Sequence, residues 1–179
     1  MSEPETQQGL FAAVVYPSSS NTRHALAAFV KSLKEDGVRV GGVLQETFRI
    51  PDGDMRGINM IDVETERRIP INYPTREEWD NRVCSLDASA LAETSVVLRH
   101  AIERRPDLIV VEKFGNSEKD GKGLMEEIFQ AIVEDIPLLV AVPEAFLENW
   151  AERSGNMGAT ISHDLASLQS WWDSLPQNR

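Results

Sequence analysis

Cysteine is almost absent from this sequence of 179 residues, which contains one, Cys84. A single cysteine forms no internal disulfide, so a disulfide-stapled secreted scaffold is excluded and a reducing cytoplasm is the expected location. Three histidines without paired ligand spacing also disfavour a structural zinc site. We interpret Cys84 as a structural or incidental thiol, because its neighbours Val83, Ser85 and Leu86 offer no base; a catalytic thiol is the alternative.

Long apolar runs and basic residues are also scarce. No run reaches the roughly 18–20 residues that a membrane span needs, so we expect no membrane insertion. The 18 Lys and Arg against 29 Asp and Glu give a net charge of −11, which argues against a nucleic-acid-binding surface. A small anion held locally by backbone N–H groups and one arginine stays possible. Residues 1–9 lack the basic start of a signal peptide, and we interpret them as a flexible lead-in.

Apolar runs alternate with amphipathic segments along the rest of the chain. Runs with the length of strands occupy 11–16, 38–44, 107–112 and 137–142. Segments with helical periodicity occupy about 22–36, 87–105, 124–134 and 143–153, with a last one from Asp164. This alternation predicts a three-layer α/β fold with a mostly parallel sheet, in a single domain over 10–175.

A hairpin interrupts this alternation. Residues 59–63 and 67–71 flank a short polar turn and predict two antiparallel strands. The second of them should be an edge strand, because Pro70 has no N–H to donate. We expect loops on both sides of the hairpin, at 46–57 and 72–86. The Gly41-Gly42 pair predicts close approach of another backbone.

The loop after the first strand has the length of a phosphate-binding P-loop, G-x-x-x-x-G-K-[ST], without its glycines. Pro17 and Thr22 stand at the glycine positions, and Arg23 and His24 replace the Lys and the Ser/Thr. Arg23 in the first helical turn opposes the helix dipole unless an anion is bound there. The candidate anion-binding residues of this loop are Ser18, Ser19, Ser20, Asn21, Thr22 and Arg23. The alternative is a helix-capping loop with a solvated arginine.

Polar residues also follow the other predicted parallel strands, whose carboxyl ends are where open α/β sheets bind ligands. The candidate ligand-binding residues there are Gln45, Glu112, Lys113, Asn116, Glu118 and Lys122. A carboxylate directly after a buried strand suits the Mg²⁺-associated acid of a P-loop enzyme, so Glu112 is the catalytic candidate if the protein is an enzyme. No residue set is predicted as a metal site. The alternative is an exposed, salt-bridged loop.

The chain resembles the uncharacterised bacterial family DUF2478. The segments that carry the resemblance are Ala12–Val15 with its loop, 40–45, 83–87, 114–118 and 121–123. The family is distantly similar to THEP1-type P-loop nucleoside-triphosphatases, whose third strand ends in D-E-x-G. Here that stretch is Glu112-Lys113-Phe114-Gly115. The resemblance therefore implies a P-loop NTPase-like fold with a degenerate Walker A loop. Relatives of the family are often associated with molybdate transport genes, so the resemblance also implies a role linked to molybdate uptake or handling.

Together these observations favour a P-loop-like protein that binds a small anion or a nucleotide phosphate in a regulatory or accessory role. Its ligand would be an oxyanion or a nucleotide with Mg²⁺, and its protein partner a component of molybdate transport. The loss of the Lys, the Ser/Thr and the catalytic Glu predicts no ordinary NTPase activity, because Lys113 is a poor base at its usual pKa near 10.4. The alternatives are a divergent Mg²⁺-dependent nucleoside-triphosphatase that uses Glu112, and an interaction module with a vestigial pocket.

Overall fold

The computed structural model describes residues 9–17, 24–51 and 53–176, which form a seven-stranded sheet in the order β4-β3-β2-β5-β6-β1-β7. The strands are β1 Phe11–Tyr16, β2 Val40–Arg49, β3 Arg56–Asp62, β4 Arg68–Asn72, β5 Leu108–Val111, β6 Leu138–Pro143 and β7 Ala159–Ser162. Five of them, β2, β5, β6, β1 and β7, run parallel, and β3 is antiparallel to both of its neighbours. The predicted mostly parallel α/β fold is confirmed, with Pro70 on the edge strand β4.

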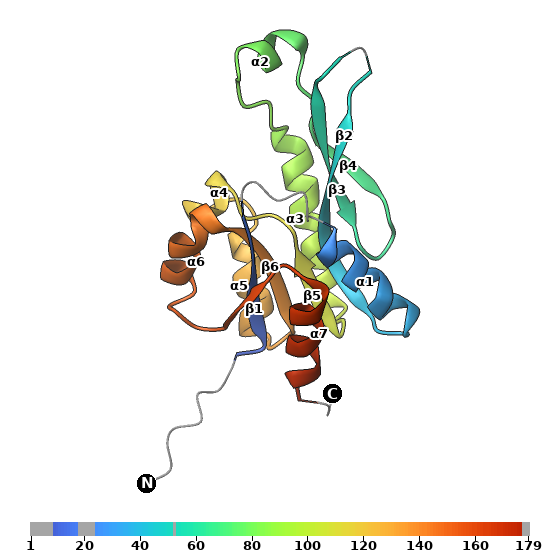
Figure 1. The fold of residues 1–179 in the computed structure, drawn as a ribbon, viewed down its shortest axis with the longest axis vertical. Helices are drawn as coiled ribbons and strands as arrows, with labels where there is room; N and C mark the ends of the chain where they lie inside the picture. Colours follow the sequence, from blue (N-terminus) through green and yellow to red (C-terminus); the bar gives the residue numbers. More distant parts are fainter. Residues whose placement is uncertain (1–8, 18–23, 52, 177–179) are drawn as a thin grey trace.

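Helices cover the two faces of the sheet (Figure 1). One face packs against α1 (Ala25–Glu35) and α7 (Leu165–Ser174), and we call it the α1 face. The other packs against α3 (Ala88–Glu103), α5 (Met125–Val133) and α6 (Leu147–Arg153), and we call it the α3 face. The remaining helices are short: α2 (Arg76–Asp80), α4 (Asn116–Lys119) and the 3₁₀ turn η1 (Glu144–Phe146).

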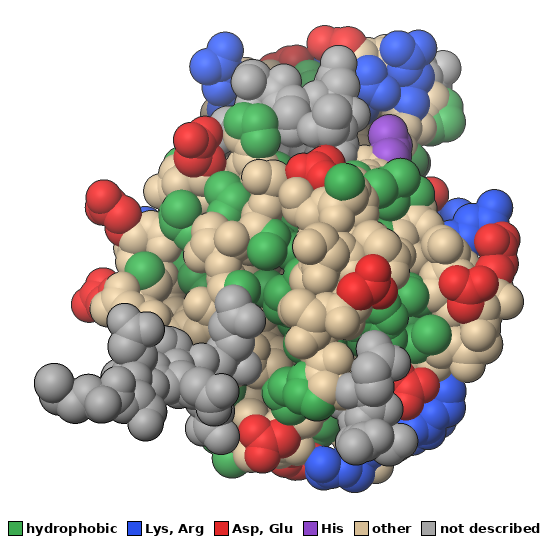
Figure 2. Space-filling model, turned by 60° about the horizontal axis from the view of Figure 1, so that its bottom comes forward, with side chains coloured by type: hydrophobic (Ala, Val, Ile, Leu, Met, Phe, Trp, Pro, Cys, Tyr) green, Lys and Arg blue, Asp and Glu red, His purple; other side chains and the backbone are tan. Residues whose placement is uncertain are grey.

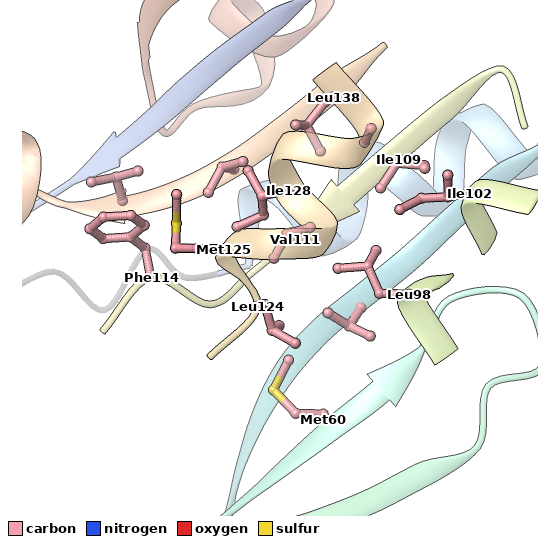
Figure 3. Close-up of a cluster of buried hydrophobic side chains, with 14 of the residues drawn as sticks. Met60, Leu98, Ile102, Ile109, Val111, Phe114, Leu124, Met125, Ile128 and Leu138 are labelled. Atoms are coloured by element: carbon pink, nitrogen blue, oxygen red, sulfur yellow. The ribbon is translucent and has the colours of Figure 1, made fainter. Parts of the chain in front are cut away.

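Each face has its own hydrophobic core, because successive residues of a strand point to opposite sides. In β5, Leu108 and Val110 belong to the core under α1, whereas Ile109 and Val111 belong to the core under α3. Figure 3 shows the second of these cores, in which Leu98 and Ile102 of α3 and Ile128 of α5 surround the apolar side chains of the sheet. All three helical side chains are fully buried.

The strand order places β6 between β1 and β5, which differs from the Rossmann and flavodoxin orders and is consistent with a P-loop NTPase-like fold. From the carboxyl end of β1 the chain passes to α1 on one face, and from the carboxyl end of β6 it passes to α6 on the other. Ligands of open α/β sheets bind where connections leave to opposite faces. The carboxyl ends of β1, β6 and β5, which we call the carboxyl edge, are therefore where the fold favours a ligand.

The hairpin is larger than its sequence pattern predicts. β2 continues to Arg49 and β3 begins at Arg56, so the expected loop over 46–57 is wrong at both ends. Beyond Val43, β2 has left β5 and pairs with β3. Residues 46–51 and 53–72 thus form an antiparallel arm that projects beyond the end of β5 (Figure 1).

Three further elements escape the sequence pattern: α2, α4 and the edge strand β7. They have five, four and four residues respectively, which is too short for a hydrophobic periodicity to be recognised in the sequence. The helix expected from Pro143 is also displaced, because Pro143 ends β6 and η1 precedes α6. The close backbone approach at Gly42 is confirmed: its φ is +109°, and a Cβ there would overlap the carbonyl oxygen of Val110 on β5.

Candidate functional site

Glu112 follows β5 directly and lies at the carboxyl edge. Its N–H donates to the carbonyl of Val43 at 2.9 Å, which extends the pairing of β5 with β2 by one residue. Its Oε2 accepts the N–H of Gln45 at 2.8 Å, and the residue is 9% exposed. Because Val110 packs under α1, strand alternation places the Glu112 side chain on the same face. The structure therefore brings together two of the candidate ligand-binding residues, Glu112 and Gln45, through the backbone N–H of Gln45.

Lys113 and Glu118 form a buried ion pair. The Lys113 Nζ lies 2.6 Å from Glu118 Oε1, and the side chains are 9% and 0% exposed. The Glu118 carboxylate also accepts the N–H of Gly115 at 2.9 Å and the N–H of Leu124 at 3.1 Å. With three donors on one buried carboxylate, Glu118 joins the start, the middle and the end of the loop between β5 and α5. We call residues 113–124 the locked loop.

The locked loop tolerates little change around this carboxylate. Gly123 has a φ of +61°, and a Cβ there would overlap Glu118 Oε1. Phe114 anchors the other end by ring contacts with Phe146 and Trp150, at centroid distances of 6.4 and 5.8 Å. The buried Glu118 carboxylate and the Phe114 ring thus hold the loop in place beside the end of β5.

The two other candidates of this loop, Asn116 and Lys122, are exposed, in α4 and in the turn after it. Their assignment to the site stays a prediction from the sequence.

The first half of the sequence-derived site, Ser18, Ser19, Ser20, Asn21, Thr22 and Arg23, lies outside the described residues. The structure does place its two flanks. Tyr16 ends β1 beside the end of β6, and α1 begins at Ala25 with His24 as N-cap, whose side chain makes no capping hydrogen bond. The helix expected from residue 22 begins three residues later, so the prediction that Arg23 lies in the first helical turn is wrong. Anion binding by the loop of residues 18–23 stays a prediction.

A polar network that the sequence did not reveal occupies the α1 face of the arm. Glu46 of β2 accepts from Asn59 Nδ2 on β3 at 3.2 Å, and from Arg68 Nε and Nη2 on β4 at 2.9 and 3.3 Å. These hydrogen bonds, that of Arg68 first, hold the pKa of Glu46 below its usual value. The three residues are 13 and 22 positions apart along the chain, so only the strand pairing could bring them together.

The surface of the described residues agrees with the acidic composition. On the face that Figure 2 shows, Lys and Arg side chains lie in separate groups near the rim rather than in one patch. No group of three metal-binding side chains occurs within the described ranges. None of the helices in that part of the chain has the length and apolarity to cross a membrane. Cys84 is exposed.

A family model described as "Protein of unknown function (DUF2478)" matches residues 11–171 of the chain. The "Molybdenum import ATP-binding protein ModC 2" of Bradyrhizobium diazoefficiens is similar to it, with 36% identity over 161 residues. The alignment covers 90% of this chain but 18% of that protein, so the chain spans less than a fifth of this relative's length. No solved structure matches the chain.

Proposed function

The chain belongs to the DUF2478 family, and we propose that it binds an anion, or the phosphate of a nucleotide, at the carboxyl edge of its sheet. In this proposal the ligand lies between the loop of residues 18–23 and Glu112. The protein acts as a regulatory or accessory component without ordinary NTPase activity.

The observation that carries the proposal is the position of Glu112 relative to α1. A buried carboxylate follows β5 directly, on the face of the sheet that α1 covers, and β1 leads to that helix. The N-terminus of a helix offers N–H groups and a favourable dipole to an anion. Mg²⁺ usually binds proteins through one or two carboxylates together with substrate phosphates, and Glu112 is suited to that part.

The buried pair of Lys113 and Glu118 supports binding without turnover. The residue after the acid at the end of this strand is where a hydrolytic relative would carry its catalytic glutamate. Here it is a lysine whose Nζ lies 2.6 Å from a carboxylate that is itself fully buried. A general base must reach the proton that it removes, and this side chain is committed to the locked loop.

The similar ModC 2 protein suggests the process in which this chain works. Its printed name assigns it to molybdenum import and to ATP binding, and this chain aligns with less than a fifth of it. We propose that the chain works beside a molybdate import ATPase, as a separate or attached accessory domain.

The test is a thermal-shift panel of ATP, GTP, molybdate, tungstate, sulfate and phosphate, each with and without Mg²⁺. A specific ligand at 100 times its dissociation constant should stabilise the wild type by about 2.7 kcal/mol. Arg23→Ala should reduce the shift if the P-loop-like segment holds the anion. No shift with any compound would reject anion binding and leave the interaction module as the better account.

The enzyme is the second candidate, because Glu112 suits a Mg²⁺-associated acid. We expect negligible phosphate release from MgATP or MgGTP by the pure protein. Robust turnover that Glu112→Gln abolishes would reverse this ranking, whereas turnover that survives the substitution would indicate a contaminating enzyme.

A further inference from the structure

We propose that Arg68, on the arm, is a second anion-binding residue of the carboxyl-edge site, oriented by Glu46. This inference rests on the proposed function, because it requires an anion or a nucleotide phosphate at that edge. It adds a contact from a strand that lies far from the P-loop-like segment in the sequence.

The strand register places Arg68 level with the end of β5. Arg68 is opposite Ile61, Ile61 is opposite Leu44, and Leu44 follows the last β2 residue that pairs with β5. Leu44 and Ile61 also line one groove with Ala27 and Val30 of α1, a cavity of about 430 Å³. Arg68 does not line this groove, which continues to Lys34 and Glu35 at the end of α1, but the strand alternation places it on the same face of the sheet as α1 and the Glu112 side chain.

The hydrogen bonds of Arg68 leave part of its guanidinium for a ligand. Glu46 takes Nε and one hydrogen of Nη2, so one edge of the planar group is fixed. Among the described residues, Nη1 makes no hydrogen bond, and the side chain is 58% exposed. An arginine held on one edge by a carboxylate can offer its other edge to two oxygens of a phosphate or oxyanion.

The carboxylate that orients Arg68 is itself held by a further hydrogen bond, which an ordinary exposed ion pair lacks. Asn59, which is 8% exposed, donates to the same Glu46 carboxylate, so a nearly buried amide fixes the group that fixes Arg68. The hydrogen bonds also lower the pKa of Glu46, which keeps the carboxylate ionised. Such backing orients a binding group, whereas an exposed pair by itself contributes little to stability.

Arg67 provides a matched control. It is the neighbouring residue, its side chain is 54% exposed, and its Nη1 lies 2.6 Å from Glu93 of α3. Arg67→Ala and Arg68→Ala therefore remove the same charge and a comparable ion pair from adjacent positions. Only Arg68 is on the α1 face, because its neighbour pairs with a helix of the α3 face.

The experiment titrates the full chain with ATP, with and without Mg²⁺, and with molybdate and inorganic phosphate, by calorimetry at two salt concentrations. For the probe that the wild type binds, Arg68→Ala should weaken affinity at least about tenfold, and Arg67→Ala less than about twofold. Arg68→Lys should recover only part of the loss, because an ammonium cannot form the bidentate contact. The melting temperature of each unliganded variant checks that the fold is intact.

Two results would overturn the inference while leaving the proposed function in place. One is wild-type affinity in Arg68→Ala. The other is an equal loss of affinity in Arg67→Ala and Arg68→Ala, which would show that the overall charge of the protein, and not a contact from Arg68, causes the effect. If the wild type binds none of the probes, the proposed function fails and this inference fails with it.

Discussion

Two buried glutamates in neighbouring helices show how differently a carboxylate can be accommodated. Glu118 in α4 is 0% exposed, and Glu127 in α5 is 5% exposed. Glu118 accepts hydrogen bonds from a lysine and two backbone N–H groups. Glu127 has one ion pair, 3.5 Å from its Oε1 to Arg99 Nε, and among the described residues its buried Oε2 has no hydrogen-bond partner.

The difference shows that burial alone does not say what a carboxylate contributes. A buried charge stabilises a fold only when hydrogen bonds and an opposite charge replace the water that it has lost. Glu118 meets that condition and holds a loop together. Glu127 does not meet it: desolvation raises its pKa, and its own backbone N–H and the charge of Arg99 oppose the rise only in part.

The largest expected change in stability comes from removing the charge of Glu118, the carboxylate whose hydrogen bonds are complete. Glu118→Gln should lower the free energy of unfolding by about 3–5 kcal/mol, because it leaves the buried Lys113 ammonium without a counter-charge. Urea unfolding at pH 7 measures this. The double variant Lys113→Met with Glu118→Gln should recover part of the loss, since the unpaired cation is then gone. A cost below about 1 kcal/mol for the single variant would mean that water reaches the pair.

A smaller effect is expected from crowding the same carboxylate. Gly123→Ala should cost about 2–3 kcal/mol, because it combines a left-handed φ of +61° with an overlap on Glu118 Oε1. Gly37→Ala is the control: its φ is +83°, but no atom lies within 4 Å of the added Cβ. The difference in unfolding free energy between the two variants isolates the contact with Glu118. Equal costs would show that backbone strain accounts for both.

The smallest effect, with the opposite sign, is expected at the unsatisfied site. Glu127→Gln should raise the free energy of unfolding by about 1 kcal/mol at pH 7, because a neutral amide avoids burying a charge with an unpaired oxygen. The pKa of Glu127 is raised, so the folded protein holds this proton more tightly than the unfolded chain does. Stability attributable to Glu127 is therefore present at low pH and falls as the pH rises above about 4.5.

The gain from Glu127→Gln should accordingly shrink as the pH is lowered from 7 towards 4.5, where the wild-type carboxyl becomes protonated. Unfolding in urea at both pH values measures the trend. Glu152→Gln is the control, since this exposed residue of α6 is not among the groups that shift the pKa of Glu127, and its substitution should change stability by less than about 0.5 kcal/mol at either pH. A gain at position 127 that does not depend on pH would contradict this account.

Much of the fold follows from local sequence patterns. Continuous apolar runs predict parallel central strands, and the four that the pattern gives all lie in one sheet. Helical periodicity over about 87–105 predicts a helix, and α3 begins there with Asp87 as its N-cap, whose side chain accepts the N–H of Ala90. Pro70 predicts an edge strand, because it cannot donate to a neighbour on that side. Each of these inferences depends on a residue's own chemistry or on its neighbours within one helical turn.

The candidate site could be predicted only in part. The sequence alone identified Glu112 as a carboxylate at the end of a buried strand, and the structure places it against the backbone of Gln45. The sequence could not show that Lys113 and Glu118 form an ion pair, because it is equally consistent with two exposed charged side chains in a loop. It gave no signal for Arg68, whose position depends on the pairing of three strands.

The sequence by itself determined the alternation of strands and helices, the edge position of the hairpin and the family. The tertiary structure decided the strand order, the extension of the arm beyond the end of β5, and which charges are paired and buried. The physical reason is the distance along the chain over which each interaction acts. Propensity, capping and apolar periodicity act over a few residues, whereas the desolvation of Glu118 and the pairing of Glu46 with Arg68 arise only when distant segments exclude water from one another.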